Sequence, residues 1–230
     1  MSTIYDWPAE FNASGFSLRL RRNTRDFTSP YSQTTQTLEL GGERWVAEVT
    51  LSISDRYAPV TLKREAFADK LAGGINRVRL WHLFNPSAGG TFTAAPVAWA
   101  ITDGGSAWPV TNSGSAWPIT DGTPALFATV PAGASTCVIQ SRPGRTATEG
   151  SMLGINGQLV RLMADATADA SGRLALTFAP RARYEWPAYS SPIVTTRPTA
   201  VFRLQGEVPT PWSAGLVAGA TFDLIEDINL

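Results

Sequence analysis

The side chains that most often carry catalysis are scarce in this sequence. The 230 residues include one histidine, His82, and one cysteine, Cys137. A Ser-His-Asp arrangement could use only His82 as its base, and a zinc site built from cysteine and histidine would need ligands from another chain. Cys137 lies in an apolar run typical of a buried, unreactive thiol, and His82 lies in a strand pattern typical of a structural histidine. The sequence therefore predicts no enzyme, no catalytic residue, no metal and no cofactor.

One polar run has a spacing that could suit calcium. Asp165, Thr167, Asp169 and Ser171 recur at every second position and could offer oxygen ligands. A calcium loop of the helix-loop-helix kind needs glycine where Ala170 stands and a bidentate glutamate at its last position, which is a leucine here. A polar hairpin is the expected interpretation.

Three tryptophans could form a binding face for another molecule. Trp99, Trp108 and Trp117 recur every nine residues, and the last two lie in identical Gly-Ser-Ala-Trp-Pro segments. Indole rings can stack on sugar rings, and they also pack well in a core or against a partner subunit. The short period and the glycine-containing turns between copies indicate stacked β segments or a duplicated hairpin, and the use of the rings stays open.

Charge is balanced overall but unevenly distributed. Nineteen Lys and Arg face nineteen Asp and Glu, which argues against a general nucleic-acid binder. A basic stretch occurs near the N-terminus, and acidic residues without bases occur near the end. These groups either form two solvated faces that meet within one molecule, or they meet across a subunit boundary, where arginine favours bidentate pairs. The residues of this hypothetical subunit interface are Arg19, Arg21, Arg22, Arg25, Asp223, Glu226 and Asp227.

The elements that must position these residues are mostly strands. Twenty glycines, sixteen prolines and 17% charged residues suit a turn-rich β protein. Period-two alternation predicts strands at 16–21 and 44–53, with a strand at 35–40 and a hairpin turn at Gly41-Gly42 between them. One helix is expected at 61–72. Further strands are expected at 75–83, 136–140, 158–164, 173–178, 199–205 and 220–228.

The helix prediction rests on its two ends. Thr61 is the expected N-cap, and Gly73-Gly74 supplies the left-handed residues that end a helix. Residues 1–10 contain no secretory signal, which predicts synthesis in the cytoplasm. Residues 80–141 contain only two charges, but glycine and proline interrupt this stretch, so no membrane insertion is expected.

Several short motifs, taken in order, resemble one known family. The sequence is similar to the distal tail proteins of long-tailed, siphovirus-type bacteriophages over nearly its whole length. The clearest motifs are Phe16-Ser17-Leu18-Arg19-Leu20, Ser29-Pro30-Tyr31-Ser32, Thr35-Gln36-Thr37-Leu38 and Gly42-Glu43-Arg44-Trp45. The helix ending at Gly73-Gly74, the Asp169–Arg173 hairpin and the strand ending at Arg203-Leu204 also resemble it.

This resemblance implies a fold and a role. The implied fold is mainly β, a tail-tube-like β-sandwich with one flanking α-helix, plus a second small β-barrel or sandwich domain. Residues 1–84 and 185–230 would form the ring-forming domain, and residues 85–184 an inserted peripheral β domain. The implied protein is a structural component of the virion, at the tail tip, where a ring, typically a hexamer, joins the tail tube protein to the baseplate hub protein and to tail fibres or receptor-binding proteins. It leaves a channel for DNA and reads no nucleic-acid sequence.

Two other functions remain open. A carbohydrate- or receptor-binding β protein of the tail tip would use Trp99, Trp108 and Trp117 as its contact face. A hydrolase with an Asp/Glu pair is the third possibility, and the sequence contains no recognisable setting for such a pair. Under the ring hypothesis, we expect the basic stretch around Arg19–Arg25 at subunit contacts or outside, because arginines lining the bore would slow the passage of DNA.

Overall fold

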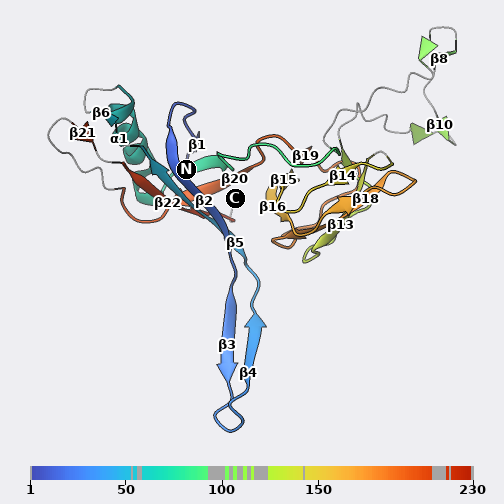
Figure 1. Ribbon diagram of the computed structural model, residues 1–230, viewed down its shortest axis with the longest axis horizontal. Helices are drawn as coiled ribbons and strands as arrows, with labels where there is room; N and C mark the ends of the chain where they lie inside the picture. Colours follow the sequence, from blue (N-terminus) through green and yellow to red (C-terminus); the bar gives the residue numbers. More distant parts are fainter. Residues whose placement is uncertain are drawn as a thin grey trace. The chain divides into compact units, whose positions relative to one another are not determined.

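The chain forms two compact units that are mainly β. The computed structural model describes residues 2–52, 54–55, 59–92, 102–103, 106–107, 111–112, 115–116, 124–141, 143–208, 216–217 and 219–228. Within these residues there are many strands and a single α-helix, α1, as the sequence predicted (Figure 1). Unit 1 comprises Met1–Pro86 and Thr199–Leu230, and unit 2 comprises Ser87–Pro198.

The second boundary between the units lies later than the sequence indicated. The expectation was that the inserted domain would end at residue 184. Trp186, however, is fully buried in the core of unit 2, and Ile193 packs against the same core. Because both residues pack in this core, the segment after residue 184 belongs to unit 2, which ends at Pro198.

Unit 1 is built on a six-stranded sheet with the order β1-β7-β20-β22-β5-β2. The first two strands in this order run parallel, and all other neighbours run antiparallel. The strands are β1 (Ile4–Asp6), β2 (Ala13–Arg21), β5 (Arg44–Leu51), β7 (Arg77–Trp81), β20 (Thr199–Leu204) and β22 (Thr221–Glu226). A separate two-stranded pair joins β6 (Ser54–Asp55) to β21 (Leu216–Val217).

One face of this sheet forms the core of unit 1. Trp45, Ala47 and Val49 of β5 are fully buried, while the residues between them point to the opposite face. Trp7 meets Phe67 of the helix and Phe222 of β22 edge-on, with ring centroids 5.8 and 5.5 Å apart. The helix therefore covers the apolar face of the sheet. The opposite face of the sheet, which carries most of its polar side chains, is here called the polar face.

The helix α1 spans Pro59–Leu71 and begins earlier than predicted. Thr61 is not the N-cap, because proline at the start of a helix is favourable and the helix has already begun at Pro59. The predicted glycine stop is correct. A 3₁₀ turn, Ala72–Gly74, follows, and Gly74 has a φ of +97° with its α-carbon so close to the sheet that a Cβ would lie 2.6 Å from the Leu204 carbonyl oxygen.

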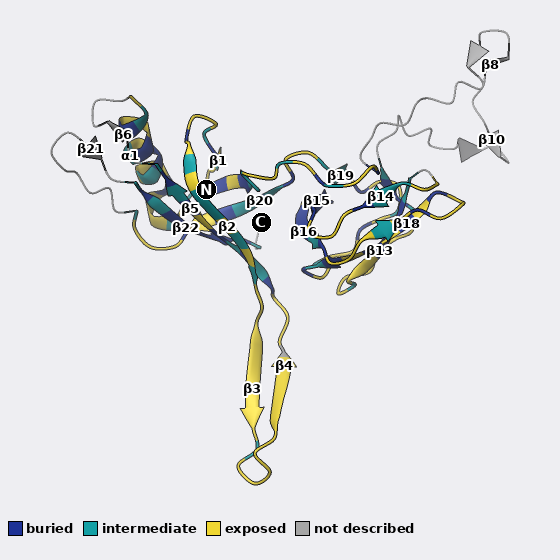
Figure 2. Cartoon of the chain, in the orientation of Figure 1, coloured by how far each residue is buried: buried dark blue, intermediate teal, exposed yellow. Residues whose placement is uncertain are grey.

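A hairpin, here called the arm, leaves the sheet between β2 and β5. It consists of β3 (Thr24–Thr28) and β4 (Thr35–Glu39), and it extends well beyond the sheet (Figure 1). All five residues of β3 are exposed (Figure 2). The sequence missed β3 and placed the hairpin turn wrongly: the chain reverses between Thr28 and Thr35, whereas Gly41-Gly42, with positive φ at both residues, leads from the arm back into β5.

Unit 2 contains a second six-stranded sheet, with the order β12-β13-β18-β16-β15-β19. Its core is centred on Trp186, which packs against Phe178 with ring centroids 5.1 Å apart. The strands are β12 (Ala125–Leu126), β13 (Thr136–Gln140), β15 (Met152–Ile155), β16 (Gln158–Leu162), β18 (Arg173–Ala179) and β19 (Ile193–Val194). A short pair, β14 (Thr146–Ala147) with β17 (Ala166–Thr167), completes the unit.

The tryptophan repeat coincides with two equivalent hairpins. β8 (Thr102–Asp103) pairs with β9 (Ser106–Ala107), and β10 (Thr111–Asn112) pairs with β11 (Ser115–Ala116) in the same register. The two ladders are nine residues apart, which supports the predicted duplicated hairpin. Trp99, Trp108 and Trp117 themselves lie outside the described residues.

The polar run near Asp169 forms a turn. The Asp169 carboxylate accepts the backbone N–H groups of Ser171 and Arg173 at 2.8 and 2.9 Å, as expected for a polar hairpin. In the described parts of the chain, no three His, Cys, Asp or Glu side chains gather where they could hold a metal ion. None of the described helices is long and apolar enough to cross a membrane.

The single cysteine provides a test of the core of unit 2. Cys137 is 5% exposed on β13, and burial raises the pKa of its thiol to about 12. Because the thiolate is the reactive form, we expect labelling by an aromatic disulfide reagent at pH 8 to be about 10³-fold slower in the native protein than in strong denaturant. Native labelling as fast as that of a free thiol would contradict this packing.

Candidate assembly surface

The basic stretch of the sequence lies where the arm meets the sheet of unit 1. Arg19 and Arg21 alternate with core-facing residues of β2, so both lie on the polar face, and both are exposed. Arg22 forms an ion pair with the buried Glu43, with 3.7 Å between Nε and Oε1. Arg25 lies within the arm, on β3. The four arginines thus divide between the sheet, its end and the arm.

The register of β2 and β5 brings a further arginine into this group. Arg21 is the direct cross-strand partner of Arg44, so two like charges share one face of the sheet. Together with Arg22, they line a hollow of about 420 Å³ at the base of the arm. Its remaining lining residues are Asn23, Thr24, Gly42 and Ile225. No acidic side chain lies among the described residues that line this hollow.

Acidic side chains form a matching pair further along the same face. Glu48 of β5 is the direct partner of Asp223 of β22, and both are exposed. Between the two charged pairs lie Val46 and Ile225, which are also direct partners. The polar face therefore carries an arginine pair and an acidic pair, and between them a row in which Val46 and the buried Ile225 are flanked by Arg19 and Arg203.

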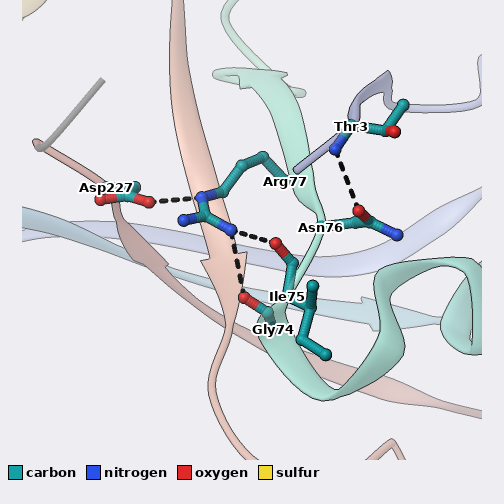
Figure 3. A network of polar contacts seen from close by, with 6 residues as sticks. All are labelled: Thr3, Gly74, Ile75, Asn76, Arg77 and Asp227. Carbon is teal, nitrogen blue, oxygen red and sulfur yellow. Dashed lines mark hydrogen bonds and ion pairs between the residues drawn. The ribbon is translucent and has the colours of Figure 1, made fainter. Parts of the chain in front are cut away.

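The last two acidic residues have partners inside unit 1. Glu226 is 3% exposed, and its Oε2 accepts the backbone N–H of Trp45 at 3.0 Å. Asp227 is 9% exposed and forms an ion pair with Arg77 (Figure 3). These residues were expected at a subunit interface, and this burial leaves Asp223 as the one exposed acid of the predicted set.

Figure 3 shows how Arg77 joins separate parts of unit 1. Besides Asp227, its guanidinium donates to the carbonyl oxygens of Gly74 and Ile75, just before β7. The neighbouring Asn76 accepts the backbone N–H of Thr3 at 3.0 Å. The C-terminal acid, the turn after α1 and the N-terminal strand are thus fixed at one place, which makes this a structural network.

The arm has two chemically different faces. One face carries Phe27, Leu38 and Leu40, which are 53%, 51% and 47% exposed, together with Gln36 and Arg25, the direct cross-strand partners of Phe27 and Leu38. The other face is lined mainly by threonines: Thr37 donates to Asp26 at 2.6 Å, and the Thr28 and Thr35 hydroxyls lie 3.3 Å apart. One face of the arm therefore forms its own side-chain hydrogen bonds. The other face, here called the apolar face of the arm, exposes three large apolar side chains beside the polar Arg25 and Gln36.

Sequence reasoning missed several residues of this surface. Arg44, Glu48 and Phe27 were not among the predicted contacts. The signal for Arg44 and Glu48 was present in the alternation of β5, where they fall between buried residues, but their cross-strand partners depend on pairing. Phe27 was missed because β3 was not predicted as a strand.

No family model matches the chain, and no curated protein matches it. The candidate assembly surface consists of the arginine pair with its hollow, the acidic pair and the apolar face of the arm.

Two arginines on the same strand test which ion pairs stabilise unit 1. We expect Arg77→Ala to lower the free energy of unfolding by about 1–3 kcal/mol, because it removes the guanidinium that pairs with the buried Asp227 and donates to two backbone carbonyl oxygens. The control is Arg79→Ala, whose partner Asp6 is 75% exposed, and its cost is expected to be about 0–1 kcal/mol. Urea denaturation gives the size of each effect, and hydrogen exchange at 77–81 and 199–204 locates it. Equal losses for both variants would contradict the assignment.

Proposed function

We propose that this chain is a structural virion protein, a distal tail component that assembles as a ring at the tip of a phage tail. In this role the ring joins the tail tube to the baseplate hub and fibres and leaves a channel for DNA. The motifs of this sequence that resemble distal tail proteins support this proposal. The single observation that carries the mechanical part of the proposal is the arm, whose apolar face has no covering partner in the described part of the chain.

The arm is poorly suited to an isolated molecule. A two-stranded hairpin is marginally stable in water, and it gains stability when one apolar face packs against another surface. Phe27 and Leu38 each leave about half of their surface exposed, and Tyr31 near the tip is 96% exposed. Complete burial of a fully exposed side chain of this size contributes roughly 1.5–3 kcal/mol, so covering the exposed half of Phe27 or Leu38 contributes about half of that, and several such residues together can stabilise an intersubunit contact.

The sheet of unit 1 also favours contacts between copies. β2 is an end strand of the sheet order, and its eight-pair ladder with β5 leaves its other edge without a partner strand among the described residues. Open edges promote uncontrolled pairing, and a closed ring removes them when each edge is covered by the next copy. A ring therefore accounts for both the arm and the open edge with one arrangement.

A carbohydrate- or receptor-binding role at the tail tip is the second candidate. The observation that favours it is the identical register of the β8–β9 and β10–β11 hairpins, after which Trp108 and Trp117 follow at equivalent sequence positions. Two equivalent aromatic positions suit a repeated ligand such as a glycan chain.

The arm proposal has a direct test in solution. We expect Phe27→Ser/Leu38→Ser to reduce self-association at least tenfold, because the apolar face no longer gains from burial. The control, Thr24→Ser/Thr37→Ser, changes the same two strands on the threonine-lined face of the arm and keeps the hydroxyl that bonds to Asp26. Light scattering gives the mass of each variant, and negative-stain images show whether rings form. A wild-type protein that is a single copy at every concentration, without rings, would contradict the ring.

The tryptophan alternative is separated by one further variant. If the repeat binds glycans, Trp108→Ala/Trp117→Ala abolishes binding on a glycan array and leaves the mass of the assembly unchanged. The ring proposal by itself predicts no glycan binding by the wild type, so wild-type binding that survives the double substitution would place the ligand elsewhere on the chain.

A further inference from the structure

We propose that the polar face of the unit 1 sheet binds a second copy of this chain through reciprocal charge pairing. In this contact the Arg21–Arg44 pair of one copy meets the Glu48–Asp223 pair of the other, and the reverse pairing occurs at the same time. This inference rests on the proposed self-assembly and adds to it a two-fold contact that is distinct from the head-to-tail contacts that close a ring.

Each pair is unfavourable in a single copy. Direct cross-strand partners have Cβ atoms about 4.5–5.5 Å apart, and like charges at such positions repel each other. Arg21 faces Arg44, and Glu48 faces Asp223, so the sheet holds two such repulsions in fixed register. None of these four side chains forms an ion pair with another described residue of the chain. A partner of opposite charge would relieve both repulsions together.

The spacing of the two pairs permits reciprocal contact. Arg44 and Glu48 lie four residues apart on β5, about 13 Å at the usual rise of a strand. Val46 and the buried Ile225 lie between them as direct partners on the same face, with the exposed Arg19 opposite Val46 on β2. Because both pairs lie on one face, a two-fold axis near Val46 brings the basic end of each copy onto the acidic end of the other. Such an isologous contact is the commonest kind between identical chains.

The chemistry of the basic end fits carboxylates. Guanidinium groups form bidentate hydrogen bonds with carboxylates, and these bonds are stronger than those between neutral groups. Arg21 and Arg44 border the hollow at the base of the arm, and its volume of about 420 Å³ leaves room for acidic side chains of a partner. Arg22, on the same hollow, is already bound to Glu43, so the free charge belongs to the cross-strand pair.

A free oxyanion such as inorganic phosphate offers the same chemistry to this hollow. It would neutralise Arg21 and Arg44, but it would leave the Glu48–Asp223 repulsion in place. A second copy neutralises both pairs with one contact. The acidic pair is therefore the observation that favours a copy of this chain as the occupant.

The experiment uses two charge-reversal variants of the full chain. The first variant is Arg21→Glu/Arg44→Glu, which makes the face wholly acidic at these positions, and the second is Glu48→Arg/Asp223→Arg, which makes it wholly basic. Each variant alone should self-associate at least tenfold more weakly than the wild type. An equimolar mixture should form mixed pairs at least as tightly as the wild type, and this pairing should weaken as NaCl is raised from 50 to about 500 mM.

A matched control reverses the same number of basic residues on a different surface of unit 1. Lys63→Glu/Lys70→Glu reverses two bases on α1, away from the polar face, and its mixture with the basic-face variant should form no preferential pairs. Circular dichroism and urea denaturation establish that each variant is folded. Because the substitutions replace exposed or half-exposed side chains, we expect folded proteins in every case.

The outcomes separate this inference from the proposed function. If both variants associate like the wild type, or the mixture shows no preference, the face contact is wrong even when Phe27→Ser/Leu38→Ser abolishes the ring. If inorganic phosphate stabilises the wild type but the Glu48→Arg/Asp223→Arg variant associates normally, the hollow is a site for a free oxyanion and the inference is also overturned. Mixed pairing by the reversed variants supports it, including when the wild type forms no ring.

Discussion

Unit 1 depends on the register between β2, β5 and β22. Trp45, Ala47 and Val49 enter the core from β5, and a shift of one residue would turn them outward and bring the alternate set, which includes Arg44 and Glu48, into the core. The Glu226 carboxylate holds the backbone N–H of Trp45 and so ties the end of β22 to the start of β5. The same register determines which residues lie on the opposite face, because side chains between the core positions must point away from the core. The arginine and acidic pairs are consequences of the same register that buries the core.

The arm follows from the same ladder. β2 and β5 pair along their full length, and the chain continues from their ends into β3 and β4 without a core beneath it. Beyond the sheet, hydrogen bonds between Thr37 and Asp26 and between Thr28 and Thr35 contribute part of the stability that core packing provides in the sheet. The apolar face of the arm gains nothing from such bonds. A hairpin that keeps apolar residues on one side only is consistent with a surface that is completed by another molecule.

Local patterns in the sequence predicted the elements that bury one face. The alternation at 16–21 and 44–53, the helix with its Gly73-Gly74 stop, and the strands near 136–140 and 173–178 are all present. The errors occur where local signals are weak or compete. β3 has no buried face, so its sequence does not alternate between apolar and polar residues. The helix begins at Pro59, two residues before the predicted N-cap Thr61. Pairings over long separations, such as the parallel contact of β1 with β7, leave no trace in local periodicity.

The same limit applies to the charged residues. The sequence identified the basic stretch and the acidic end, but it could not say which charges are satisfied within the chain. Arg77 lies beside a turn whose carbonyl oxygens are free to accept, and Asp227 completes its shell. Arg21 and Arg44 are direct partners in the β2–β5 ladder, and neither forms an ion pair with another described residue, so their guanidinium groups are left to solvent or to another molecule. The net charge of zero does not distinguish the arginines that stabilise the fold from those whose charge is unpaired within the described chain. That distinction depends on strand pairing, which the sequence does not show.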